Sequence, residues 1–264
     1  MMKTIDRLSY GNKLRAVSPM WKCGFAALLL LIAYVAHPWI QLLIFLWMLI
    51  WLIGYAAIPA KQVALMLGAS CLFFIGSLPA LIIEVRNMDF GHEMAHGIVL
   101  FSLSHWTIYM NLTSLMSAGQ LLIRIMACVS ASFFVILTTP MSELFQVMKV
   151  LRVPTLVLEI MMITYRFLFL LSDTAHDMYT AQQSRGGQSG FAGKIRDTAT
   201  LIARLFVKTM QRYQGLTNGL ISRGFTDELR LPPYVKKAVP ERYKVEACMG
   251  VAVLVILECW IRWG

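Results

Sequence analysis

The residues best suited to chemistry form the pattern H-E-x-x-H in one short polar stretch, with His92, Glu93 and His96 at its fixed positions. On a helix the two histidines would share one face and bind a zinc ion, and Glu93 would activate a water on that metal. The extended form of the pattern needs glycine at position 99 and histidine at 102, where this chain has Val99 and Ser102. The stretch is therefore a partial signature of a zinc protease.

Three interpretations of this stretch stay open. The first is a catalytic zinc site, but Gly91 and Gly97 disfavour a stable helix there, and no later apolar segment offers a third ligand. The second is a weak metal-collecting loop that includes Asp89 and His105, since imidazoles and carboxylates suit cobalt, nickel or zinc. The third, which we favour, is a plain polar loop.

The composition of the chain indicates that membrane helices would position any such site. The 264-residue chain is 58% hydrophobic and only 14% charged, whereas soluble domains carry about a quarter charged residues. Its apolar residues come in long blocks, and a transmembrane helix needs roughly 20 such residues. We therefore predict an all-α, polytopic integral membrane protein, in which a protease built on residues 92–96 would be an intramembrane zinc metalloprotease.

The distribution of charge sets the expected topology. Basic residues before the first apolar block place the N-terminus in the cytoplasm, because lysine and arginine are retained on that side. The net charge of +10 has the same explanation. With no phosphate loop and no basic run interleaved with aromatics, we exclude nucleic acid as a partner. We expect a multi-pass protein of the inner (cytoplasmic) membrane, with spans at residues 23–36, 39–58, 63–83, 115–137 and 246–263.

One long segment between the last two spans has a different character. Residues 138–244 carry 15 lysines and arginines against eight acidic residues. The stretch 156–171 is nearly apolar enough to cross the membrane, but crossing would leave the basic residues after it outside. We therefore predict three parts: helices 1–4 in residues 1–137, a cytoplasmic helical module in 138–244, and a last helix in 245–264. The module is amphipathic, so its apolar faces need partners, which would be the lipid bilayer, each other or another protein.

The module contains a short internal repeat, in which Ser-Arg-Gly follows an amphipathic run twice, 38 residues apart. Glycine permits the left-handed conformation that ends a helix, and an arginine there is favoured by the helix dipole. The pattern predicts two helices that each present an arginine at the C-terminal end, suited to two equivalent pockets of a dimeric partner. Two ordinary helix ends are the alternative. The residues of the repeat are Ser184, Arg185, Gly186, Ser222, Arg223 and Gly224.

These motifs resemble those of the T components of energy-coupling factor transporters, which carry paired Ala-Arg-Gly sequences at the ends of two coupling helices. Serine stands in place of alanine here, at both positions. The opening, residues 5–22, is similar to that of the cobalt-type branch, called CbiQ. The link at residues 138–154 and the stretch Tyr165–Phe167 also resemble that branch. The resemblance covers most of the chain in the right order.

The resemblance implies a non-catalytic coupling subunit of an ATP-driven importer of cobalt (or nickel). Each motif would dock into one of two ABC-type ATPase subunits, with Arg185 and Arg223 as the transmission contacts. A separate substrate-binding membrane subunit, CbiM-like and possibly accompanied by a CbiN-like protein, would hold the transported ion. This chain would bind no cofactor, since ATP and magnesium would be held by the ATPases.

Four methionines of the module are candidates for a sliding contact with that substrate subunit. Methionine is flexible and packs against changing surfaces, which suits a moving interface. Ordinary packing between membrane helices is the alternative explanation for them. The four residues are Met148, Met161, Met162 and Met178.

Overall fold

The structure, a computed structural model, describes the whole chain except residues 1, 88–96, 104–105, 188–189, 225–236 and 264. The described residues are mostly helical and divide into two compact units. Unit 1 is formed by Met1–Leu144 together with Val235–Gly264, and unit 2 by Phe145–Tyr234. The helical fold predicted from the sequence is confirmed, and the three-part division by membrane side stays a prediction.

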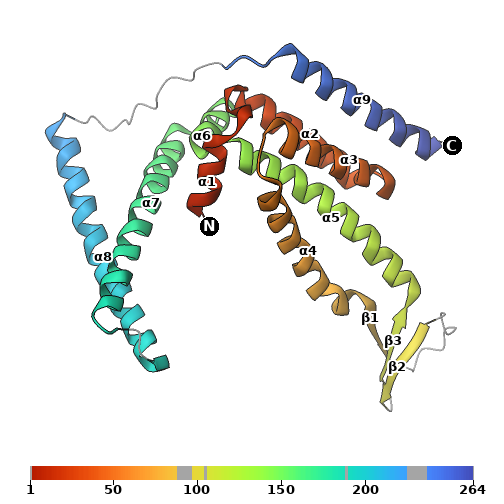
Figure 1. Cartoon of the computed structure of the whole chain (residues 1–264), viewed down its shortest axis with the longest axis horizontal. Coiled ribbons are helices and arrows are strands. Elements are labelled where there is room, and N and C mark those ends of the chain that lie inside the picture. The colour runs from red at the N-terminus through yellow and green to blue at the C-terminus, as the bar shows by residue number, and fades with distance from the viewer. Residues whose placement is uncertain (1, 88–96, 104–105, 188–189, 225–236, 264) are drawn as a thin grey trace. The chain divides into compact units, whose positions relative to one another are not determined.

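Unit 1 is a bundle of membrane-type helices (Figure 1). Its elements, in chain order, are α1 (Met2–Gly11), a 3₁₀ turn (Lys13–Ala16), α2 (Pro19–Val35), α3 (Pro38–Ile50), a π-helical turn (Trp51–Tyr55), α4 (Ala60–Ile82), three strands, α5 (Leu112–Thr138), the start of α6 (Met141–Val150) and α9 (Glu241–Trp263). Helix α2 begins at Pro19, before the predicted span that starts at residue 23, and α3 begins at Pro38 after a break.

The α2–α3 connection shows how the end of a membrane helix is satisfied at a proline turn. Gln41, almost fully buried, donates from Nε2 to the carbonyl oxygens of Ala33 (3.0 Å) and Ala36 (2.8 Å). The last carbonyls of a helix have no partner within it, and leaving them bare in an apolar medium is costly. One amide from the next helix therefore ends α2 and holds α3 against it.

The centre of unit 1 is an aromatic cluster around Trp51, whose side chain is almost fully buried. Its ring lies 5.3 Å from that of Phe25 and 6.2 Å from that of Phe134, measured between centroids. Tyr55 stacks on it at 4.6 Å. Such pairs add about 0.5–1.5 kcal/mol each beyond their area burial, so α2, α3 and α5 are fixed together at this level.

The last helix, α9, runs antiparallel to α3 along its whole length. Near its start Tyr243 meets Trp51, with ring centroids 6.0 Å apart. Near its end Glu258 accepts hydrogen bonds from the backbone N–H of His37 (3.0 Å) and lies 2.8 Å from that residue's Nδ1. Between these points Gly250 lies against the indole of Trp47, where no side chain would fit.

Substitution of Gly250 is expected to loosen α9. A Cβ at this position would overlap the ring of Trp47, and overpacking of this kind costs typically about 1–3 kcal/mol. We expect Gly250→Leu to lower the thermal unfolding midpoint of the detergent-purified chain. Gly68→Leu on α4 is the matched control, because nothing lies within 4 Å of the Cβ added there. Equal midpoints for the two variants would contradict this packing.

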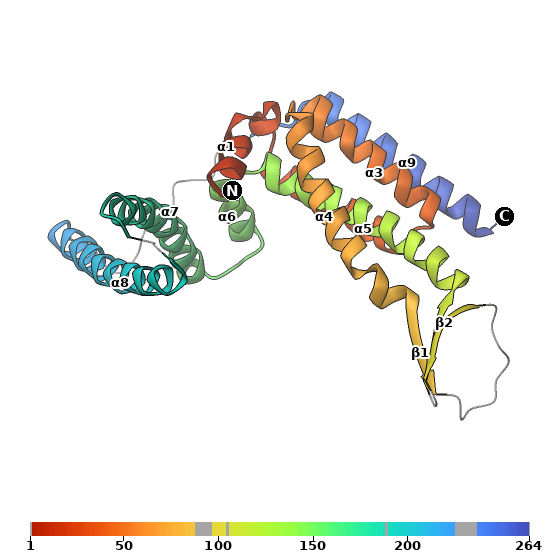
Figure 2. The same ribbon diagram turned by 60° about the horizontal axis from the view of Figure 1, so that its bottom comes forward.

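A small antiparallel sheet connects α4 to α5 (Figures 1 and 2), which the hydropathy pattern did not predict. Strand β3 (Trp106–Asn111) lies between β1 (Ile83–Asn87) and β2 (Gly97–Leu103), with Ile83 opposite Met110 and Gly97 opposite Asn111. The strands are rich in β-branched and aromatic residues, which favour extended backbone. Residues 97–103 and 106–111, which we assigned to no membrane span, thus belong to a sheet at the far ends of α4 and α5.

Four helices among the described residues are long and apolar enough to cross a membrane: Pro38–Tyr55, Ala60–Leu81, Ser114–Thr138 and Thr155–Ser184. Helix α2 is apolar but shorter, at 17 residues. Helix α9 falls outside this group because three charged residues, Glu246, Glu258 and Arg262, interrupt its apolar run. The protein is therefore a multi-pass membrane protein, and whether α7 crosses the membrane stays a matter of prediction.

Unit 2 is an antiparallel pair of long helices, α7 (Thr155–Ser184) and α8 (Gly190–Ser222), preceded by the end of α6 (Figure 2). Phe145 on α6 packs edge-on against Tyr165 on α7, at 5.9 Å between centroids. Only Leu158 and Thr174 are buried on α7, and no described residue is buried on α8. The apolar faces of both helices are therefore largely uncovered within the described chain.

Candidate functional site

The two Ser-Arg-Gly sequences occupy equivalent places in unit 2. Helix α7 ends at Ser184 and α8 ends at Ser222. The glycine that follows each arginine has a positive φ, +76° at Gly186 and +69° at Gly224, which a residue with a side chain rarely adopts. The prediction of two helices that end at these glycines is confirmed.

The backbone of the two ends follows one hydrogen-bond pattern. The N–H of Arg185 donates to Gln182 O at 3.1 Å, and that of Arg223 donates to Leu220 O, also at 3.1 Å. Bonds across three residues tighten the last turn of each helix and leave the arginine immediately beyond it. Each arginine therefore lies at the negative end of a helix dipole, where a cation is favoured.

The serines in these motifs direct their hydroxyls back into their own helices. Ser184 Oγ donates to Thr180 O at 2.9 Å, and Ser222 Oγ donates to Asn218 O at 2.8 Å. A hydroxyl engaged in this way has no donor left for a partner protein. Relative to alanine, serine at these positions therefore adds no free donor, and its oxygen keeps the capacity to accept a hydrogen bond.

Both arginines are exposed, and neither forms an ion pair within the described part of the chain. An exposed arginine presents a rigid fork of donors that matches a carboxylate or a pair of carbonyl oxygens. The two guanidiniums are thus available to an external acceptor.

The distance between the motifs follows from the helix that separates them. The first motif immediately precedes α8 and the second ends it, and α8 has 33 residues. At 1.5 Å per residue the helix is about 50 Å long. One small pocket cannot receive both arginines, so a partner would need two separate docking sites.

A buried charge cluster lies in unit 1, just before the chain enters unit 2 and just after it leaves. Glu143 Oε1 accepts a hydrogen bond from Lys237 Nζ at 2.5 Å, and its other carboxylate oxygen lies 3.9 Å from Lys22 Nζ. Lys22 is fully buried, although lysine is rarely so. One carboxylate on α6 is thus held from two sides, by α2 and by the segment before α9.

The same cluster closes the C-terminal end of α5. Lys22 Nζ donates to Thr138 O at 2.8 Å, and Asn12 Nδ2 donates to the carbonyl oxygens of Leu137 (3.2 Å) and Thr138 (3.3 Å). Lys237 Nζ also donates to Arg15 O at 2.7 Å. The N-terminal segment, α5 and both covalent connections of unit 2 therefore meet at one hydrogen-bonded point.

Sequence analysis missed this cluster. The hydrogen bonds that form it join residues 94 and 116 positions apart along the chain, so no local spacing indicates them. The available signal was a lysine at the start of an apolar helix and a glutamate just after the Thr-Thr-Pro link. Each is ordinary by itself, and only the tertiary fold joins them.

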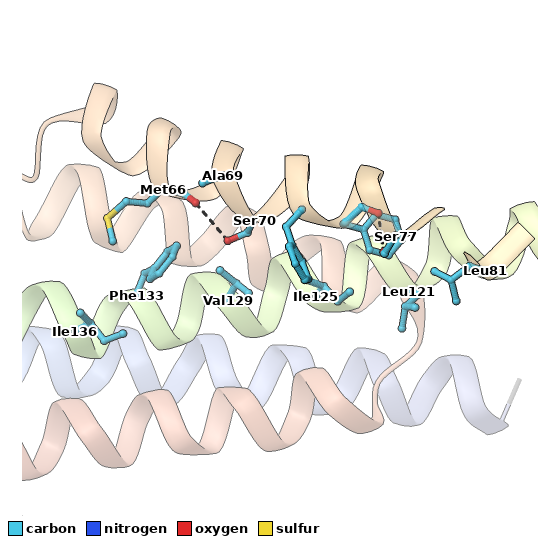
Figure 3. Close-up of a pocket in the computed structure, with 12 residues that line it drawn as sticks. Met66, Ala69, Ser70, Ser77, Leu81, Leu121, Ile125, Val129, Phe133 and Ile136 are labelled. Carbon is cyan, nitrogen blue, oxygen red and sulfur yellow. Dashed lines mark hydrogen bonds between the residues drawn. The ribbon is translucent and has the colours of Figure 1, made fainter. Parts of the chain in front are cut away.

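An apolar pocket of about 710 Å³ lies between α4 and α5 (Figure 3). Its two serines are satisfied within α4, since Ser70 Oγ donates to Met66 O at 3.3 Å and Ser77 Oγ donates to Phe74 O at 2.7 Å. None of the twelve lining residues carries a carboxylate, imidazole or thiol. The pocket suits a hydrocarbon chain or an apolar helix and not a metal ion.

The remaining predicted residues are placed as follows. His92, Glu93 and His96 lie outside the described residues, as do Asp89 and His105. No group of three metal-binding side chains occurs within the described residues. All four candidate methionines are half-buried; Met162 also lines a groove between α7 and α8. A sliding role for them stays a prediction.

Comparison with known proteins gives consistent matches. A family model described as CbiQ, cobalt transport protein, matches residues 11–234. An uncharacterised protein of Methanocaldococcus jannaschii is 30% identical over 86% of this chain and 82% of its own length. The cobalt transport protein CbiQ of Salmonella typhimurium is 26% identical over 83% of this chain and 95% of its own. A putative fused cobalt transport protein CbiMQ of Methanocorpusculum labreanum is 26% identical over 86% of this chain and 37% of its own.

The helices define the class: this is a multi-pass, helical membrane protein. Because the family model spans most of the chain, including both Ser-Arg-Gly ends, the chain belongs to the CbiQ family of cobalt transport proteins. It is a membrane component of a transporter and not an enzyme. The resemblance to the CbiQ branch is confirmed, and the alternative of an intramembrane metalloprotease has no support.

Proposed function

We propose that this chain is the coupling subunit of an ATP-driven importer of the energy-coupling factor type, which imports cobalt or nickel. The observation that carries the proposal is the matched pair of arginine-bearing helix ends, about 50 Å apart along α8. Two identical ends at that spacing suit a partner with two equivalent sites. Two ABC-type ATPase subunits would supply those sites and bind ATP and magnesium.

The transported ion would be held by a second membrane subunit. The name of the fused CbiMQ relative supports a CbiM-like partner, since one chain there carries both names. A CbiN-like small protein is a further component that the resemblance implies.

Charge supports a specific orientation in the inner membrane. The N-terminal segment and residues 138–244 are both rich in lysine and arginine, and basic segments stay on the cytoplasmic side. In this orientation the Ser-Arg-Gly ends face the compartment that contains ATP. The contact between α9 and the α2–α3 turn, through Glu258 and His37, would then lie on the outer side.

Affinity purification of the chain from its host in mild detergent tests the assembly. We expect two copies of ABC-type ATPase, or two related ones, and a small multi-pass membrane protein to copurify, with the latter identifying the cargo. The control is a chain with both arginines of the repeat replaced, which should retain the membrane partner and lose the ATPases. Recovery of the wild-type chain without any ATPase would refute the proposal.

A further inference from the structure

A groove between α7 and α8 combines three arginines with an apolar wall. It has a volume of about 530 Å³ and is lined by Arg166 from α7, by Arg212 from α8, by Arg223 just after α8, and by six apolar side chains from the two helices. Ligand-binding clefts typically measure about 300–1,000 Å³. The groove is therefore large enough for an organic ligand.

The charge of the groove is uncompensated. No carboxylate is among its lining residues, and none of its three guanidiniums forms an ion pair within the described chain. Like charges that share a cleft repel each other, and the repulsion is relieved when an anion binds between them. Arginine also matches the geometry of a phosphate group, through paired N–H donors.

The apolar wall narrows the choice of anion. Met162, Phe167 and Leu170 from α7 face Leu216 and Leu220 from α8 across the groove. A free phosphate or nucleotide would leave this surface in contact with water. An amphiphile with an anionic phosphate and hydrocarbon chains would satisfy both the cations and the wall.

The composition of α7 places the groove at the bilayer. Thr155–Ser184 has the hydropathy of a membrane-crossing helix, yet only 6% of its most apolar window is buried in the described chain. Two of its large apolar residues, Leu156 and Ile160, are more than half exposed. At the groove, Arg166 from α7 and Arg212 from α8 add basic side chains to these apolar helices, and such a combination is stable in the headgroup region of a membrane, where anionic lipids attract basic side chains.

We propose that this groove binds an anionic phospholipid, with the phosphate between Arg166 and Arg212 and the acyl chains along the apolar wall. Arg223 lies at the end of the groove and belongs to the second Ser-Arg-Gly motif. A bound lipid would therefore order the helix end that carries this arginine. The inference rests on the proposed function only for the cytoplasmic placement of unit 2, and the lipid site itself requires no ATPase.

The test uses the purified full-length chain in nanodiscs that contain phosphatidylglycerol diluted in phosphatidylcholine. Native mass spectrometry after detergent release counts the phosphatidylglycerol molecules retained per chain. We expect Arg166→Gln with Arg212→Gln to retain them roughly tenfold less, since each basic residue near an anionic surface contributes appreciably to lipid affinity. Arg204→Gln with Lys208→Gln, exposed on α8 outside this groove, loses the same charge and should retain the lipid.

Three outcomes would overturn the proposal. If both double variants retained equal amounts of phosphatidylglycerol, lipid binding would depend on overall charge and not on this groove. Equal retention of phosphatidylcholine and phosphatidylglycerol by the wild type would show that the arginines do not select an anion. Displacement of the lipid by inorganic phosphate alone would assign the site to a free anion. Because the assay contains no ATPase, its failure leaves the coupling proposal unaffected, and loss of ATPase copurification leaves the lipid site unaffected.

Discussion

Replacement of Arg185 and Arg223 by alanine together is expected to abolish ion uptake while the chain stays folded and inserted in the membrane. Both side chains are exposed and unpaired in the described chain, so their loss costs the isolated subunit little. In the complex, truncation of one partner of a buried charged contact typically costs about 2–5 kcal/mol. Two such losses would weaken docking by several orders of magnitude.

The measurement is cobalt or nickel accumulation in cells, together with ATP hydrolysis by the purified complex. We expect each single variant to reduce the uptake per ATP hydrolysed and the double variant to reduce it further, because the two ends dock at separate sites. The matched control is Arg204→Ala with Lys208→Ala, which removes two exposed charges from the middle of α8. Normal uptake by the double arginine variant would refute docking through these ends.

The second large effect is expected at Glu143. This carboxylate is paired with Lys237 and lies beside the fully buried Lys22. Glu143→Leu would leave a buried ammonium with carbonyl partners only, and breaking a buried pair by removing one partner costs about 3–5 kcal/mol. We expect a large fall in the unfolding midpoint and faster hydrogen exchange in residues 12–16 and 137–143.

A second substitution shows whether the instability of Glu143→Leu comes from the unpaired buried charge or from altered packing. Because Lys22→Met removes the buried ammonium as well, the double variant with Glu143→Leu should regain most of the stability. Lys237, which is 28% exposed, can then turn to water. The control is Glu246→Gln, which breaks an exposed pair with Arg242 within one turn of α9 and should change stability little. A Glu143→Leu variant as stable as the control would contradict the role assigned to the cluster.

The Glu143 cluster has a mechanical consequence for the proposed coupling. The chain enters unit 2 two residues after Glu143 and returns close to Lys237, and these two residues are paired with each other. Glu143 also lies beside Lys22 of α2, and Lys237 donates to Arg15 O in the 3₁₀ turn. Motion that begins at the helix ends of unit 2 would reach the membrane bundle through this point. Glu143 variants that still fold should therefore hydrolyse ATP with reduced uptake.

Local signals in the sequence predicted the helices and their ends. Pro38 and Pro59 interrupt apolar runs, and a proline inside a helix removes a hydrogen bond, so the breaks on either side of α3 could be located. Gly186 and Gly224 indicated the ends of α7 and α8 for a similarly local reason, since glycine tolerates a positive φ.

Tertiary contacts could not be predicted from local sequence signals. The pairing of Glu258 with His37 joins residues 221 positions apart, and the Arg166–Arg212 groove joins two helices whose facing sides depend on how the hairpin closes. The sheet of residues 83–111 was missed because its mixed polar and apolar residues show neither a helical nor a membrane period. Long-range contacts of this kind can be identified only once the fold is known.

Site-specific photo-cross-linking would show whether both Ser-Arg-Gly ends dock on the ATPase subunits. A photoreactive amino acid would be placed at position 184 or 222, beside each arginine, in the assembled complex within the native membrane, and at position 204 as the control. We expect cross-links from positions 184 and 222 to ABC-type ATPase subunits, in comparable yield, and none from position 204. Cross-links from 184 and 222 only to lipid or to another membrane protein would contradict it.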